Sequence, residues 1–203
     1  MKTQEKKTAR GKLAVLATAT IGVLALPACA DVSTSANPQT IAQPSPSPSP
    51  SGSLLPRTVV VALPDVQKVF PELTVETDMG ANPTAAGNPT ATRSVAFTNS
   101  DGSKKVTISV DEYANPDDAS QGYQQAVQQS QAVPGFSSVE VPVVGDQAFA
   151  GKVTQDGVTH IGIGVLQDNL VVGATTAGYD ANPANVAKLG ALMAAAVAVA
   201  KNR

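Results

Sequence analysis

The chain has 203 residues, of which 15% are charged and 3% aromatic, with no tryptophan and a formal net charge of −2 at pH 7. A slightly acidic chain lacks the basic surface that attracts nucleic acids, so we expect no nucleic-acid partner. Cys29 is the single cysteine. The chain therefore forms no internal disulfide, and the fold must be stabilised by packing alone.

Residues 1–28 have the organisation of an export signal. Lysines and an arginine dominate the first twelve positions, and residues 13–26 (LAVLATATIGVLAL) carry no charge. An apolar run of about 14 residues is typical of a signal peptide, whereas a membrane-spanning helix needs about 20. The chain is therefore predicted to be exported.

The sequence around Cys29 leaves two ways of removing this signal open. Residues 26–29 (LPAC) are similar to the lipobox of bacterial lipoproteins, in which the cysteine is diacylated and begins the mature chain. Residues 28–30 (ACA) also fit ordinary secretory cleavage, which would discard the cysteine. Alkylation protects an unpaired exported thiol from oxidation and so favours the first route. We predict a palmitate-bearing lipid anchor at Cys29 and a location on the extracytoplasmic face of the cell membrane.

Residues 29–57 predict a disordered linker after the lipidated cysteine. Positions 44–53 read PSPSPSPSGS, and proline alternating with serine forms neither a helix nor a sheet ladder. A flexible coil of this length spans on the order of 30 Å, which would keep a domain near the membrane. Two interpretations of this linker stay open. Its serines and threonines are O-glycosylated, or the linker is an unmodified spacer. Residues 58–203 have the length of one folded domain.

Strand patterns occur in two groups. Residues 93–99 and 104–111 flank Ser-Asp-Gly-Ser and predict a hairpin. The later group predicts a three-stranded meander, and the alternating residues 137–144 (SSVEVPVV) lead into it. Its strands cover residues 146–154, 157–166 and 169–176. Before the hairpin, residues 80–92 (GANPTAAGNPTAT) predict a loop that is either a lid over a groove or a plain connection.

Two long helices are predicted, over residues 115–131 and 182–201. Both ranges open with Asn-Pro, which supplies an N-cap and a proline at the first helical position. In the first helix, Asp117 and Asp118 suit the positive end of the helix dipole. The second helix is rich in alanine, and its uncharged run is too short to cross a bilayer, so we expect it to pack on a sheet. Residues 63–70 predict a shorter leading helix.

The order of elements predicts an α+β fold. A hairpin followed by a helix occurs twice, and two such units most easily share a single antiparallel sheet with both main helices on one face. This layout, the Gly-Asp-Gln-Ala-Phe run at 145–149 and the hydrophobic last helix resemble the extracytoplasmic domains of actinobacterial lipoproteins. The similarity covers residues 63–200 and includes the extracellular sensor domain of PknH-type kinases, with the LpqN/LpqT-type lipoproteins as a second possibility. It implies a groove between sheet and helices and a ligand-binding role.

Candidate catalytic residues lack partners in the sequence. His160 is the only histidine, and no cysteine, glutamate or second histidine lies near it. Gly162 and Gly164 share its strand face and leave a trough that a helix or a ligand could approach. The acid pairs Asp111-Glu112 and Asp117-Asp118 lack the spacing of a calcium loop. We therefore predict no catalytic residue, no metal site and no cofactor.

These observations predict a membrane-anchored extracytoplasmic lipoprotein without catalytic activity. We expect it to bind a small or lipid-like molecule, or a cell-wall fragment, through residues that the sequence does not reveal. The alternative is a structural or interaction protein that docks on a membrane or envelope partner through an exposed sheet face or edge. An enzyme is the third possibility, because the sequence shows no pair of nucleophile and base.

Overall fold

The computed structural model describes residues 52–141 and 143–202. The predicted signal, Cys29 and most of the linker lie outside the described residues. These described residues belong to one compact unit, and their two hydrophobic clusters lie between Leu55 and Ala200. Since the unit contains its own core, it meets the requirement for independent folding.

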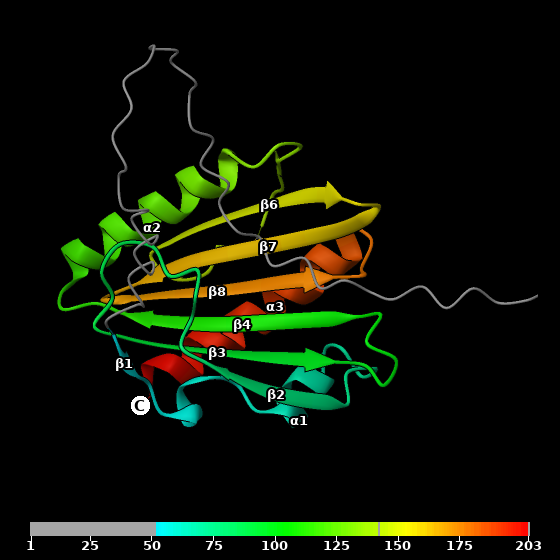
Figure 1. Cartoon of the computed structure of the whole chain (residues 1–203), viewed down its shortest axis with the longest axis horizontal. Helices are drawn as coiled ribbons and strands as arrows, with labels where there is room; N and C mark the ends of the chain where they lie inside the picture. Colours follow the sequence, from blue (N-terminus) through cyan, green and yellow to red (C-terminus); the bar gives the residue numbers. More distant parts are fainter. Residues whose placement is uncertain (1–51, 142, 203) are drawn as a thin grey trace, which may run out of the picture. The chain divides into compact units, whose positions relative to one another are not determined.

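The domain is built on one eight-stranded sheet (Figure 1). The strand order is β1-β3-β4-β8-β7-β6-β5, and β2 pairs with β3 beside β1. The strands are β1 (Ser53–Leu54), β2 (Val75–Gly80), β3 (Ala91–Thr98), β4 (Lys105–Glu112), β5 (Ser137–Ser138), β6 (Gln147–Gln155), β7 (Val158–Gln167) and β8 (Leu170–Ala177).

The prediction of a purely antiparallel sheet is wrong at one edge. β1 runs parallel to β3, whereas the other pairs are antiparallel. The chain enters here from the linker, and the backbone N–H of Ser53 donates to the carbonyl of Thr90. The parallel pairing lasts two residues because the chain then turns into the 3₁₀ helix η1 (Arg57–Val59). The single sheet itself is confirmed.

The predicted hairpin and meander are confirmed within two residues at their ends, but two other strands differ. β5 covers only Ser137–Ser138 of the predicted strand at 137–144. The backbone N–H of Val139 still donates to the carbonyl of Ala150 in β6, and the side chains of Val139 and Val141 pack against the main core. β2 was not predicted. Five of the six residues of VETDMG are exposed, so no buried face imposes an alternation of apolar and polar residues on this strand.

The helices are α1 (Leu63–Gln67), α2 (Pro116–Gln131) and α3 (Pro183–Lys201). The two long ones, α2 and α3, begin where the Asn-Pro signals predict. The side chain of Asn115 accepts from the backbone N–H of Asp118, and that of Asn182 accepts from the backbone N–H of Asn185, both at 2.9 Å. Each bond satisfies an amide that the helix itself leaves unpaired. The short leading helix predicted over residues 63–70 is confirmed as α1, which ends at Gln67, whereas η1 was not predicted.

The two long helices lie on opposite faces of the sheet, so the prediction of one shared face is wrong. In Figure 1 the strands pass in front of α3, whereas α2 lies on the near side. α3 belongs to the larger core cluster with Val165, and α2 belongs to the smaller cluster with Leu166. Neighbouring residues of a strand point to opposite faces. Because this end of the sheet is apolar on both faces, each face requires its own helix.

The same arrangement limits the symmetry between the two hairpin–helix units. Their inner strands, β4 and β8, pair antiparallel at the centre of the sheet, as a two-fold axis perpendicular to the sheet would require. That axis would place both helices on one face, yet Tyr113 packs in the cluster under α2 and Tyr179 in the cluster under α3. The internal similarity is therefore confined to the sheet and the helix starts.

Taken over its whole length of 19 residues, α3 is apolar enough on average to cross a membrane, although Lys188 interrupts it and the uncharged run is shorter than a span needs. In the structure, however, its core-facing residues are buried against the sheet. Leu189, Leu192 and Met193 are completely buried there. The prediction that this helix packs on the sheet is confirmed.

Candidate functional site

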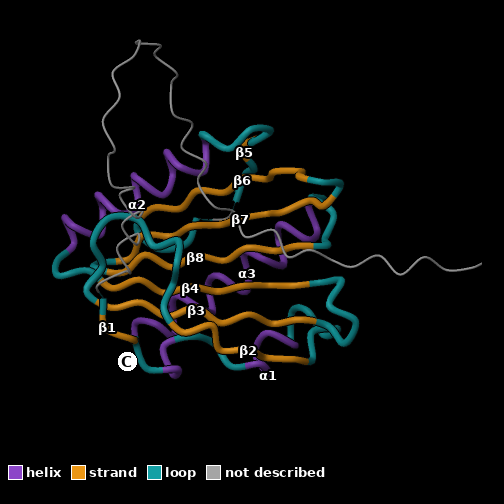
Figure 2. The backbone as a smooth tube through the Cα atoms, in the orientation of Figure 1, coloured by secondary structure: helices purple, strands orange, loops and turns teal. Residues whose placement is uncertain are grey.

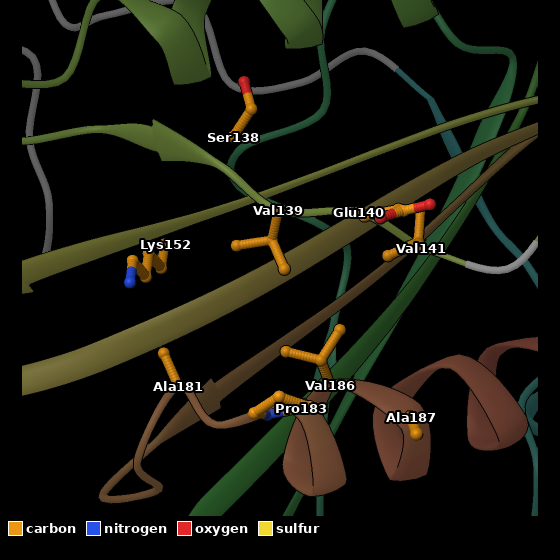
Figure 3. Close-up of a pocket in the computed structure, with 9 residues that line it drawn as sticks. All are labelled: Ser138, Val139, Glu140, Val141, Lys152, Ala181, Pro183, Val186 and Ala187. Atoms are coloured by element: carbon orange, nitrogen blue, oxygen red, sulfur yellow. The ribbon is translucent and has the colours of Figure 1, made fainter.

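A groove opens between the start of α3 and the segment that follows β5 (Figure 3). We call it the α3 groove, and its volume is about 560 Å³. Small-molecule sites typically occupy about 300–1,000 Å³. Its lining residues are Ser138, Val139, Glu140, Val141, Lys152, Ala181, Pro183, Val186 and Ala187.

The walls of the α3 groove are mainly apolar. Val139 and Val141 occupy alternate positions of an extended segment, and Figure 3 shows them facing α3, where Val186 lies opposite. Val139, Val141 and Ala181 are half-buried and pack against the main core. The groove is therefore an open extension of the core, and apolar groups that enter it gain about 25 cal/mol for each Å² removed from water.

Charged groups of opposite sign border this apolar surface. Glu140 lies between the two valines, and Lys152 lies on β6; both are exposed. In Figure 3 the hydroxyl of Ser138 points away from α3. An apolar floor with a few polar groups at its edge can bury one end of a ligand and orient the other.

A second, smaller hollow lies on the other face of the sheet, between residues 81–90 and α2. We call it the loop–helix pocket, and its volume is about 190 Å³. Its walls are mostly polar. The lining residues are Gly87, Asn88, Tyr113, Asp118, Gln121, Gly122 and Gln125.

The loop of this pocket is held to the sheet by buried hydrogen bonds. The side-chain amide of Asn82 donates to both carboxylate oxygens of Asp111, and the hydroxyl of Tyr113 donates to the carbonyl of Ala86 at 2.6 Å. Figure 2 shows this loop, between β2 and β3, crossing the sheet towards α2. The loop was predicted as a lid or a plain connection, and the structure shows it fastened at both Asn82 and Ala86.

Burial perturbs the two titratable groups beneath this loop. It raises the pKa of Asp111 to about 7, although the hydrogen bond from Asn82 acts in the opposite direction. Burial also raises the pKa of Tyr113 well above its usual range, and the charge of Asp111 adds to that increase. Both effects follow from the cost of a charge in a site that excludes water.

The structure separates the other residues that the sequence singled out. His160 lies on the strand face opposite Ile161, and its cross-strand neighbours are Val153 and Ala177. These neighbours are apolar, so the ladder brings no acid or nucleophile beside the imidazole.

The predicted trough on β7 is filled at one end by a side chain. A Cβ at Gly164 would overlap the ring of Phe149, which in turn contacts Tyr123 of α2. At Gly162 the nearest side-chain atom would be Cγ2 of Thr175, at 3.7 Å. A helix was predicted to occupy the trough. In the structure the Phe149 ring fills the space at Gly164, and α2 packs on that ring through Tyr123.

The two acid pairs do not converge on a metal. Asp111 points into the interior, whereas Glu112 points to the other sheet face because strand residues alternate. Asp118 is engaged with Asn115 in the first turn of α2. Among residues 52–141 and 143–202, no three His, Cys, Asp or Glu side chains gather in a metal-binding group.

No protein-family model matches the sequence, and the search of curated proteins finds no match. Among solved structures, the extracellular domain of PknH from Mycobacterium tuberculosis is similar, with a TM-score of 0.50 and 13% sequence identity. The match covers 71% of this chain and 92% of that domain. The two share a fold. The resemblance predicted from the order of elements is thus confirmed at the level of the fold, and the identity is too low to carry a function.

Two further solved structures match with lower scores. The Rv0999 ortholog from Mycobacterium smegmatis has 15% identity and a TM-score of 0.36, over 68% of this chain and 73% of that protein. LpqN of Mycobacterium tuberculosis, described as involved in cell envelope biogenesis, has 13% identity and a TM-score of 0.23, over 61% and 64%. LpqN, the second predicted resemblance, is thus among the matching structures, although the TM-scores of these two matches are too low to show a shared fold.

Proposed function

We propose that this chain is an extracytoplasmic binding protein without catalytic activity, which holds a small or lipid-like molecule or a cell-wall fragment in the α3 groove. One observation carries the proposal. Val139 and Val141 are half-buried, they line an open groove against the buried Val186, and their apolar surface is continuous with the core. Leaving such a surface uncovered has a cost that a bound ligand would remove.

The proposed location rests on the N-terminal sequence and on the fold. The basic and apolar residues before Cys29 support export, and the domain shares its fold with a domain of another protein that is extracellular. A diacylated Cys29 would hold the domain at the cell membrane, because two buried acyl chains make attachment effectively permanent. The linker then leaves the α3 groove free to meet its ligand outside the membrane.

A second candidate function is docking on an envelope protein partner. Val143, just beyond the segment that lines the groove, is 95% exposed. A fully exposed valine beside an open apolar groove is also what a protein interface offers. In this case Val143→Glu should weaken partner binding, whereas a small ligand confined to the groove would be retained.

The test is native mass spectrometry of the protein purified from its own host. Wild-type protein is expected to carry an additional small-molecule mass. Ala187→Trp places a large side chain in the groove and should abolish that mass. Ala194→Trp is the matched control, because Ala194 is exposed on the same helix and does not line the groove. Wild-type protein without added mass, or Ala187→Trp protein that retains it, would contradict the proposal.

A further inference from the structure

We propose that the loop–helix pocket is a second binding site, which takes one ring of a neutral, polyhydroxylated ligand, that is, a saccharide unit. The pocket lies between the loop at residues 81–90 and α2, on the sheet face opposite α3. This site does not depend on the α3 groove, because the two share no lining residue.

One row of polar side chains forms the helical wall. Asp118, Gln121 and Gln125 are spaced three and four residues apart along α2, so they lie on one side of the helix. Asn88 and Gly87 of the loop form the opposing wall. Polar side chains therefore approach a ligand from two directions.

The chemistry of these walls matches hydroxyl groups. Each of the amides of Asn88, Gln121 and Gln125 presents a donor and an acceptor, and a sugar hydroxyl both donates and accepts. Asp118 accepts a hydrogen bond from Asn115 through Oδ2, which leaves Oδ1 to accept from a ligand. Neighbouring hydroxyls of one ring can therefore be paired from both walls.

Other classes of ligand fit this pocket less well. No Lys, Arg or His is among the seven lining residues, so an anion would find no opposite charge. Asp118 is their only carboxylate, whereas a calcium ion needs six to eight oxygen ligands. The polar walls disfavour an apolar ligand, and about 190 Å³ is too small for an extended peptide but suits a single ring.

The loop wall is already in place before any ligand binds. The bonds from Asn82 to Asp111 and from Tyr113 to Ala86 hold the loop against the sheet. A Cβ at Gly122 would overlap the Tyr113 hydroxyl, so glycine is what allows this tyrosine to lie beneath α2. A wall that is fixed in advance loses less conformational entropy on binding. This role also gives a reason for burying a carboxylate at position 111 whose hydrogen-bond donor is a neutral amide.

The test is an NMR titration of residues 45–203, the unit with its own core. The probes are glucose, galactose, mannose and N-acetylglucosamine, each added to millimolar concentration. At least one sugar should cause saturable shifts of the Gly87 and Gly122 amides, while the methyl groups of Val139 and Val186 stay unchanged.

Variants of the helical wall test whether those shifts report the pocket. The double variant Gln121→Ala and Gln125→Ala should weaken binding about tenfold or more, which corresponds to a loss of about 1.4 kcal/mol. Gln124→Ala is the control, because Gln124 is exposed on α2 outside the pocket. The proposal is overturned if none of the four sugars shifts these amides, if the shifts move to the α3 groove, or if the double variant binds like the control. None of these results bears on the mass carried in the α3 groove.

Discussion

The side-chain nitrogen of Asn82 lies 3.0 Å and 2.9 Å from the two carboxylate oxygens of Asp111, across a separation of 29 residues. Asp111 is only 4% exposed. Its hydrogen-bonding partner is a neutral amide, which satisfies the oxygens without neutralising their charge. This pair joins the loop at residues 81–90 to β4, so one of the bonds that hold the loop is made to a buried acid.

The buried acid should make stability depend on pH. The pKa of Asp111 is about 7 in the folded state against an ordinary value of 3.8, so the folded state binds the proton more tightly than the unfolded state. The free energy of unfolding should therefore fall as pH rises from about 4 to about 7, by at most about 4 kcal/mol, and then level off. Urea denaturation at pH 5 and pH 8 should record the larger part of this fall, between about 2 and 3 kcal/mol.

Asp111→Asn should remove most of that pH dependence, because the amide carries no charge to bury. At pH 8 the variant is expected to be more stable than wild type, since its side-chain oxygen still accepts from Asn82. Asp117→Asn, an exposed acid in the first turn of α2, serves as the control and should leave the pH profile unchanged. A wild-type stability that is equal at pH 5 and pH 8 would show that Asp111 is not the buried charge described here.

Two glycines of β7 should respond differently to alanine. A Cβ at Gly164 would overlap the Phe149 ring, so Gly164→Ala should destabilise the domain by about 1–3 kcal/mol. At Gly162 the nearest atom would be at an ordinary contact distance of 3.7 Å, so Gly162→Ala should be nearly neutral. Urea denaturation of the two variants provides the comparison, and equal losses of stability would refute this account of the trough.

The N-cap of α3 should contribute measurably to stability. Asn182→Ala leaves the backbone N–H of Asn185 without its acceptor and should lower the free energy of unfolding by about 1 kcal/mol. Asn182→Ser keeps a side-chain oxygen at the cap and should recover most of the loss. Chemical denaturation of the pair tests the cap. If the serine variant is no more stable than the alanine variant, the cap bond is not what stabilises the helix start.

The proposed lipid anchor gives a prediction for Cys29. Wild-type protein expressed in its host should incorporate labelled palmitate and fractionate with membranes, because the diacylated sulfur is the attachment point. Cys29→Ser should incorporate no label and appear in the soluble fraction. An unlabelled wild-type protein would favour ordinary signal cleavage, and the cysteine would then be absent from the mature chain.

The sequence by itself determined the elements whose signals are local. Asn-Pro marks both long helix starts because capping involves atoms within three residues of the cap. The turns of the meander are equally local, and Asp156 and Asp168 adopt the left-handed conformation that such tight turns require. The apolar alternation of β4 predicted a strand with one buried face, and the order of two hairpin–helix units predicted the single sheet.

Only the tertiary structure decided which parts of the chain meet. The face chosen by α2, the bond between Asn82 and Asp111, and the approach of Val139 to Val186 all join residues that are far apart in the sequence. No local pattern specifies these partners, because each contact forms only when the whole sheet has positioned both sides. Both candidate sites are made of such contacts, so neither was visible in the sequence, although a groove beside the helices was expected.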